Sequence, residues 1–123
     1  MQPTVKSTLV IGASENPDRY SWMAVNMLKE YGHKVQAVGI KPGSINGVDI
    51  LTGQPVFENL HTISLYVSPK HQADLYTYIL KLNPKRVIFN PGTENPELMD
   101  LLMKAGISSE EACTLVLLRT GLF

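Results

Sequence analysis

The loop after the first apolar run carries residue types that bind a phosphate group. Gly12 allows a sharp turn and brings the backbone close to a ligand, and Ala13 and Ser14 add little bulk. A helix is expected to begin near Ser21, so its free amides and the positive end of its dipole face the same space. Arg19 adds a bidentate charged contact. These features predict an anion site, although an ordinary turn with an exposed arginine fits the same residues.

The same loop lacks the dinucleotide fingerprint of NAD enzymes. The pattern Gly-x-Gly-x-x-Gly would need glycine where Ser14 and Pro17 stand. A carboxylate for the ribose is expected about twenty residues later, but the second apolar run ends in Lys41-Pro42-Gly43 with no acid. Lys41 offers a contact to a second phosphate, as in CoA or NADP, and a solvated lysine in a turn is the alternative. NAD is therefore disfavoured.

Two later loops add candidate contacts. Residues 67–71 bring backbone amides, a hydroxyl and two potential cations to the expected start of a helix. Residues 90–96 are rich in turn formers, and Gly92 allows close approach to the arm of a ligand. Each loop is equally explained as a helix cap without a ligand.

These loops separate short apolar runs that alternate with helical patterns. The runs predict strands at residues 8–13, 35–40, 63–67, 86–89 and 107–112, with a further short strand at 48–51. Helical spacing predicts helices at residues 22–31 with Ser21 as N-cap, at 69–82 with Ser68 as N-cap, at 96–105 with Asn95 as N-cap, and at 114–120.

Short buried strands that alternate with helices predict parallel pairing. We therefore expect one α/β domain over residues 1–123, a Rossmann-like doubly wound parallel sheet of about five strands with helices on both faces. Such sheets bind ligands at the carboxyl ends of their strands. This rule brings the candidate loops to one end of the molecule.

Composition limits the classes of partner. The 123 residues include eleven basic and eleven acidic side chains, so we expect no bulk attraction to nucleic acid or to an acidic membrane. Cys113 is the single cysteine, which excludes an internal disulfide framework and favours a reducing compartment. Residues 1–8 lack the apolar run of a signal peptide. We expect a cytoplasmic protein that binds a small-molecule nucleotide.

Three stretches resemble the stand-alone CoA-binding domain proteins. They are residues 10–21 (Val-Ile-Gly-Ala-Ser-x-Asn-Pro-x-Arg-x-Ser), 90–97 (Asn-Pro-Gly-Thr-Glu-Asn-Pro-Glu) and 111–116 (Glu-Ala-Cys-Thr-Leu-Val). Those proteins are similar to the CoA-binding domain of the succinyl-CoA synthetase alpha subunit. The resemblance covers essentially the whole chain. It implies a Rossmann-like fold that holds coenzyme A or acyl-CoA.

The resemblance also implies three groups of binding residues. The pyrophosphate side would be held by Gly12, Ala13, Ser14, Arg19 and Ser21. The adenosine and its 3′-phosphate would lie near Lys41, Pro42 and Gly43, and the other wall would be Val67, Ser68 and Pro69. After the second predicted strand, at residues 35–40, the family often has Asn-Pro, whereas this chain has Ile40-Lys41-Pro42.

We expect a binding module without catalytic machinery of its own. The synthetases need a further domain with a phosphorylated histidine, for which this chain is too short. The three histidines, His33, His61 and His71, have neither metal-ligand spacing nor a triad order. Cys113 is expected to be a small buried residue, with a mixed disulfide to CoA as the alternative, and Trp22 to be a core or a ligand-stacking residue.

Two other functions stay open. A small NADP-dependent oxidoreductase is weakened by the missing glycines and by the lack of a catalytic acid or base near the loops. The second alternative is a nucleotide-sensing protein-interaction domain with a vestigial nucleotide cleft. The apolar residues 115–118 and 122–123 serve either the core or a homodimer.

Overall fold

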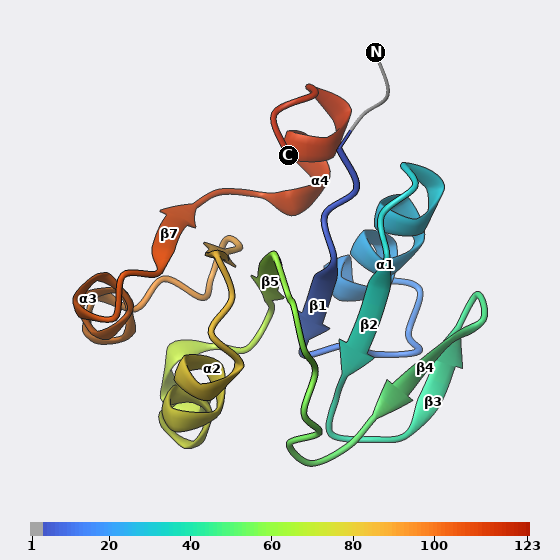
Figure 1. Ribbon diagram of the computed structural model, residues 1–123. Helices are drawn as coiled ribbons and strands as arrows, with labels where there is room; N and C mark the ends of the chain where they lie inside the picture. The colour runs from blue at the N-terminus through green and yellow to red at the C-terminus, as the bar shows by residue number, and fades with distance from the viewer. Residues whose placement is uncertain (1–3) are drawn as a thin grey trace.

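The computed structural model describes residues 4–123, and its strands form one seven-stranded sheet (Figure 1). The strands are β1 (Thr8–Ile11), β2 (Val35–Val38), β3 (Gly43–Ile45), β4 (Val48–Leu51), β5 (Thr62–Leu65), β6 (Arg86–Phe89) and β7 (Ser108–Glu111). Their order is β3-β4-β2-β1-β5-β6-β7, and all neighbours are parallel except the pair β3 and β4. The predicted Rossmann-like α/β class is confirmed.

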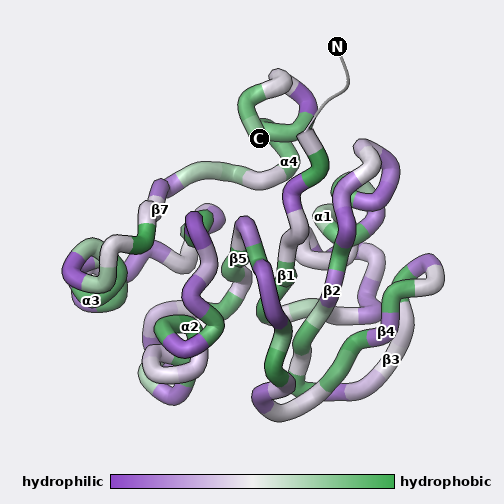
Figure 2. The backbone as a smooth tube through the Cα atoms, in the orientation of Figure 1, coloured by the Kyte–Doolittle hydropathy of each residue, from purple (hydrophilic) through white to green (hydrophobic). Residues whose placement is uncertain are grey.

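Helices cover both faces of this sheet. They are α1 (Tyr20–Glu30), α2 (Tyr76–Leu82), α3 (Pro96–Lys104) and α4 (Thr114–Arg119), with two 3₁₀ turns, η1 (Pro69–His71) and η2 (Ala73–Leu75). Figure 1 shows α1 beside α4, while α2 and α3 lie together on the other side of the sheet. In Figure 2, hydrophobic stretches recur along the chain, whereas β7 is hydrophilic.

Two cores follow from the alternation of side chains along the strands. In β1, Leu9 and Ile11 pack with α2 and α3, whereas Val10 between them packs with α1 and α4. All three are buried, and each such side chain contributes about 1.5–3 kcal/mol of transfer free energy. A strand buried on both faces reads as a continuous apolar run, which is why β1 was identifiable from the sequence.

The strand count exceeds five because the segment after β2 forms a hairpin. Its turn is Asn46-Gly47, and both residues have positive φ (47° and 84°), as a type I′ turn requires. The short strand predicted at residues 48–51 is confirmed as β4, and its partner β3 is an addition. The Asn-Gly pair was the signal for this hairpin.

Two predicted helix starts are wrong. Helix α2 begins at Tyr76 rather than at residue 69, and the Ser68 side chain caps neither α2 nor η1. Gln72 explains the delay: it is fully buried, and its side-chain amide donates to the carbonyls of Val67 (2.8 Å) and Thr93 (2.7 Å). These bonds fix the path of the chain before α2.

The first helix also begins earlier than expected. Its N-cap is Arg19, and Ser21 lies buried inside the first turn. By contrast, Asn95 caps α3 as predicted, because its Oδ1 accepts from the amides of Glu97 (3.1 Å) and Leu98 (3.4 Å). Residues 1–3, part of the stretch where we expect no signal peptide, lie outside the described chain. No helix in residues 4–123 is long and apolar enough to cross a bilayer.

Candidate functional site

The loops after β1, β2 and β5 meet at one end of the sheet because these three strands are adjacent and parallel. The Val38 carbonyl accepts from the amides of Gly12 (2.9 Å) and Ala13 (3.0 Å). On the other side, the Tyr66 amide donates to the Ile11 carbonyl at 2.9 Å. Strand order reverses at β1, so this is the crevice where doubly wound sheets take their ligands.

Two glycines let the β1–α1 loop lie against its neighbours. Gly12 has φ +94°, and a Cβ there would stand 3.0 Å from the carbonyl carbon of Tyr66. A Cβ on Gly39 would stand 2.3 Å from the carbonyl oxygen of Ala13. Any side chain at Gly39 would therefore push the β1–α1 loop away from the end of β2.

The start of α1 presents amide donors without protein partners. Its N-cap, Arg19, makes no side-chain capping bond, and the first turn contains no acidic residue. No acceptor in residues 4–123 receives a hydrogen bond from the amides of Tyr20, Ser21 or Trp22. Such donors, with the positive end of the helix dipole, suit an anion.

Several backbone amides of this loop already have acceptors within the protein. The amides of Gly12 and Ala13 bind Val38, as described above. Ser14 Oγ accepts from the Asn16 amide at 3.1 Å, and Asn16 Oδ1 accepts from the Asp18 amide at 3.0 Å. Gly12 and Ala13 therefore offer no free amide to an anion, whereas the first turn of α1 does.

The expected cations are exposed on either side of this turn. Arg19 and Lys41 are both exposed, and Pro42 beside Lys41 is exposed as well. Within residues 4–123 the ion pairs are Arg86 with Glu110 and Lys104 with Asp100, so neither Arg19 nor Lys41 is engaged by a carboxylate. Both cations are available to a ligand.

The third group of predicted residues forms the opposite side of the crevice. Val67 and Ser68 are half-buried, and Pro69 is exposed at the start of η1. Val67 packs against the core on the α2 and α3 side. Lys70, the next residue along the chain, is exposed. The structure thus brings all three predicted groups to the carboxyl end of the sheet.

Tyr66 is a feature of this region that sequence reasoning did not single out. Its hydroxyl is buried and has no hydrogen-bond partner within the described chain. Burial raises the pKa of Tyr66 to about 12, although the nearby hydroxyls of Ser64 and Thr114 oppose this shift. Nothing in the sequence distinguishes Tyr66 from an ordinary aromatic residue.

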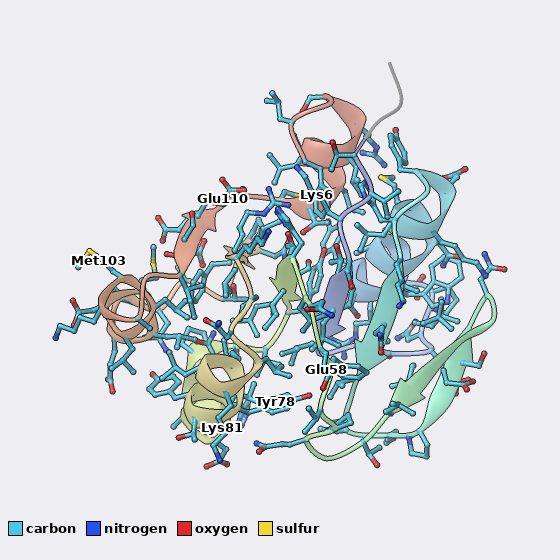
Figure 3. The ribbon with its side chains drawn as sticks, in the orientation of Figure 1. Lys6, Glu58, Tyr78, Lys81, Met103 and Glu110 are labelled. Carbon is cyan, nitrogen blue, oxygen red and sulfur yellow. The ribbon has the colours of Figure 1, made fainter. Side chains whose placement is uncertain are left out.

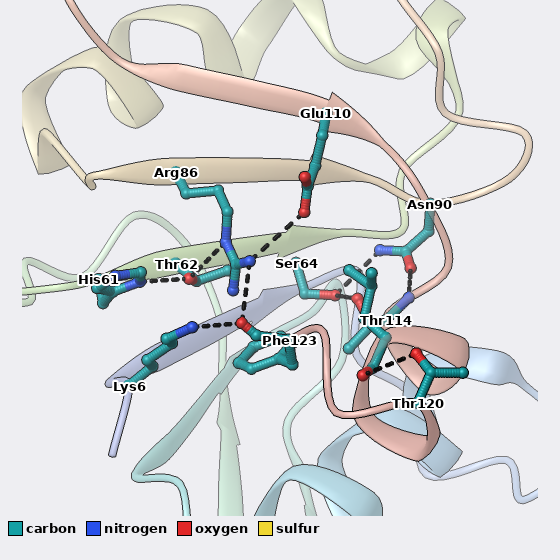
Figure 4. Close-up of polar contacts among 11 residues, drawn as sticks. Lys6, His61, Thr62, Ser64, Arg86, Asn90, Glu110, Thr114, Thr120 and Phe123 are labelled. Atoms are coloured by element: carbon teal, nitrogen blue, oxygen red, sulfur yellow. Dashed lines mark hydrogen bonds and ion pairs between the residues drawn. The ribbon is translucent and has the colours of Figure 1, made fainter. Parts of the chain in front are cut away.

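Ser64 and Thr114, which lie near the Tyr66 hydroxyl, belong to a polar network with Asn90 (Figure 4). Asn90 is buried, and its side-chain amide donates to Ser64 Oγ and to the Leu65 carbonyl, both at 3.0 Å. Its Oδ1 accepts from the Thr114 amide at 2.9 Å, while Ser64 and Thr114 share a hydrogen bond of 2.7 Å. Asn90 therefore ties β5, β6 and α4 together.

The remaining predicted residues have structural surroundings. Trp22 is half-buried against the core on the α1 and α4 side, which favours the core interpretation. Cys113 is half-buried rather than buried, and it stands at the N-cap of α4. His33 and His61 lie at the amino end of the sheet, away from the loops, and His71 is exposed in η1.

Two surface grooves lie away from these loops. One runs between α3 and β7 and is lined by residues that include Met99, Met103 and Ile107. The Met103 side chain is exposed to solvent on α3 (Figure 3). The other follows β2 and β4. Neither groove includes a predicted site residue.

The fold defines a doubly wound, Rossmann-like α/β protein. Residues 6–119 match the family described as CoA binding domain, and the chain belongs to that family. No curated protein matches the chain. A crystal structure of an uncharacterized protein is 46% identical, with a TM-score of 0.95, over 98% of this chain and 99% of that one.

More distant structures share the fold. The structure of cell-free ID.343 from Thermus thermophilus is 23% identical with a TM-score of 0.82, covering 96% of this chain and 91% of that one. A hypothetical protein from Pyrococcus horikoshii OT3 is 23% identical with a TM-score of 0.80, covering 94% of this chain and 83% of that one. At these identities the likeness concerns the fold alone.

Proposed function

We propose that this protein binds coenzyme A or an acyl-CoA and holds its pyrophosphate at the start of α1. The observation that carries the proposal is a set of three amides, those of Tyr20, Ser21 and Trp22. They have no acceptor within residues 4–123, and the exposed Arg19 lies beside them. Membership of the CoA-binding domain family supports CoA as the nucleotide. The pyrophosphate supplies the negative charge that these donors suit.

The other predicted residues would hold the rest of the cofactor. Lys41, Pro42 and Gly43 lie one strand away from β1, on the side proposed for the adenosine and its 3′-phosphate. Val67 and Ser68 form the opposite side, from which the pantetheine arm would leave. Gly12 and Ala13 would shape the floor through their backbone bonds to Val38 rather than bind phosphate themselves.

We further propose that the protein works as a cytoplasmic binding module that buffers, delivers or senses the cofactor. No catalytic step is assigned to any side chain of the crevice. The alternative, an NADP-dependent oxidoreductase, would use the same phosphate contacts but needs a proton donor or acceptor beside the nicotinamide. Tyr66 does not serve that role well, because its hydroxyl is buried and burial raises its pKa to about 12.

Thermal unfolding with four nucleotides separates these functions. A ligand that binds only the folded state raises the apparent stability by mass action, by about 2.7 kcal/mol at one hundred times its Kd. We expect CoA to raise the unfolding temperature, and NADP, NAD and ATP to have little effect. A shift with NADP alone would support the oxidoreductase, and no shift with any of them would refute nucleotide binding.

Arg19→Ala tests the contacts directly. Loss of a charged hydrogen bond to the pyrophosphate should weaken CoA binding about tenfold, measured by isothermal titration calorimetry. Stability in urea should not change, because Arg19 makes no ion pair within the described chain. Arg119→Ala is the matched control, since Arg119 is an exposed arginine in the last turn of α4. Equal affinity of the Arg19→Ala variant and the wild type would refute this site.

A further inference from the structure

Glu15 of the β1–α1 loop reaches across to the first residues of β3. Its Oε2 accepts a hydrogen bond from the Ser44 amide at 2.9 Å. The side chain also lies directly on Gly43, where a Cβ would stand 2.3 Å from Glu15 Cδ. Because Gly43 does not have a positive φ, its turn does not require glycine. The missing side chain at Gly43 instead makes room for the carboxylate.

Within the described chain, Glu15 makes no ion pair with a neighbouring side chain. In residues 4–123 the carboxylates that form ion pairs are those of Glu110 and Asp100. Lys41 comes three residues before Ser44 and is exposed. The segment from Lys41 to Ser44 therefore combines the cation of Lys41 with the anion that Glu15 brings to Ser44.

This carboxylate changes the chemistry expected at the end of β2. The sequence of that strand end contains no acid, and on that ground alone a ribose phosphate meets only Lys41. In the structure, a phosphate that sits on the start of β3 meets the like charge of Glu15 and finds the Ser44 amide already used. A hydroxyl meets a carboxylate oxygen that accepts hydrogen bonds.

We propose that Glu15 is a specificity-determining residue that weakens the binding of nucleotides with a phosphate on the adenosine ribose. The inference rests on the proposed function, in which the adenosine end of CoA lies on the β2–β3 loop. Glu15 competes with the 3′-phosphate for the Ser44 amide and repels it. Its carboxylate thus limits the preference for CoA over dephospho-CoA, the same molecule without the 3′-phosphate.

The test compares the Kd of CoA and of dephospho-CoA for the wild type and for Glu15→Gln, by isothermal titration calorimetry. Glutamine removes the charge but keeps an oxygen that accepts from the Ser44 amide. The preference for CoA over dephospho-CoA should rise about three- to tenfold, as expected for one like charge near a solvent-exposed phosphate.

A second variant reaches the same carboxylate from the other side. In Gly43→Ala the new Cβ should displace the flexible end of Glu15, whose Cγ would be only 2.6 Å away. The preference for CoA should then rise as in Glu15→Gln, and the double variant should add little to either. Glu94→Gln is the matched control: its carboxylate also accepts from a backbone amide, that of Gly92 at 2.9 Å, but in the loop after β6.

The outcomes separate the two proposals. An increased preference for CoA in Glu15→Gln, with no change in Glu94→Gln, supports the role of Glu15. If all proteins bind CoA but the ratio of the two Kd values stays constant or falls, Glu15 does not act as proposed, while the proposed function stands. If neither the wild type nor any variant binds either ligand, the proposed function fails and this inference fails with it.

Discussion

Arginine and lysine side chains lie at both ends of the sheet. Lys6 and Arg86 lie at the amino end, where the strands begin. Arg19 and Lys41 lie in the loops that follow the carboxyl ends of β1 and β2. At the amino end, Arg86 Nε donates to Thr62 Oγ1 (3.1 Å), and its Nη1 donates to the Phe123 carbonyl (3.3 Å) (Figure 4). At the carboxyl end, Arg19 and Lys41 are exposed and make no ion pair within the described chain.

The amino-end cations are committed to the fold. The Arg86 side chain is only 13% exposed, and its guanidinium lies 4.5 Å from the centre of the Phe123 ring. Lys6 Nζ donates to the carbonyl of Phe123, so both cations hold the end of the chain against β1 and β6. Residue type alone therefore does not identify a binding cation, because the acceptors around it decide whether it stabilises the fold or is available to a ligand.

Asn90→Ala tests whether the buried polar network at the carboxyl end of the sheet stabilises the fold. Of the predicted changes, it should have the largest effect. The change removes three buried hydrogen bonds and leaves the Leu65 carbonyl and the Thr114 amide without the Asn90 side chain. We expect the free energy of unfolding to fall by about 3 kcal/mol in urea titrations.

The control for this variant is Asn26→Ala. Asn26 is half-buried and makes a single side-chain bond, to the Trp22 carbonyl at 3.0 Å, so its loss should change stability by about 0.5 kcal/mol or less. Equal stability losses in the two variants would mean that the buried bonds of Asn90 contribute no more to stability than the single bond of Asn26.

Sequence reasoning succeeded where the signal was local. The apolar runs of β1 and β6 and the Asn95-Pro96 cap of α3 are short patterns with one physical cause each, burial or capping. The Asn46-Gly47 turn was equally local, although its hairpin was only half predicted. Such signals fix the class of the fold and the position of the crevice.

The remaining features depend on contacts between distant parts of the chain. The start of α2 is set by bonds from Gln72 to the Thr93 carbonyl, 21 residues away. The contact of Glu15 with Ser44 spans 29 residues, and that of Arg86 with Phe123 spans 37. Only the parallel pairing of the strands brings these residues together, so no local pattern contains them.

Arg86→Ala should separate the two ends of the sheet. It removes the stacking on Phe123 and the bonds to Thr62 and Glu110, and we expect the free energy of unfolding to fall by about 2 kcal/mol. The Kd for CoA should stay at the wild-type value when measured well below the unfolding temperature. Arg19→Ala should do the opposite and change affinity but not stability.

This pair of variants is a direct test of the comparison. Calorimetry and urea titration on both proteins give four numbers, of which two should change. If Arg86→Ala weakened CoA binding as much as Arg19→Ala, Arg86 would belong to the ligand site or control it. The assignment of the amino-end cations to stability and of the carboxyl-end cations to binding would then be wrong.

The smallest predicted effect is a loss of stability in acid that originates at the amino end. Burial lowers the pKa of His33, and the charges of Lys6 and Arg86 lower it further. Burial is also the main cause that lowers the pKa of His61, followed by the same two cations. The unfolded chain therefore binds more protons as the pH falls through 6.5, the ordinary value for histidine.

Stability should thus be complete above pH 6.5 and should fall as the pH drops below it toward the lowered pKa values of the folded state. The structural cause at His33 is direct, because its Nδ1 accepts from the Lys6 amide at 3.0 Å and a protonated Nδ1 has no lone pair to accept with.

Urea midpoints at pH 7.5 and 5.5 measure the loss. His33→Gln should reduce the difference between them, since glutamine does not titrate, while His71→Gln, at an exposed position in η1, should leave it unchanged. If both variants behaved like the wild type, the acid loss would have to come from outside the Lys6, Arg86 and His33 cluster.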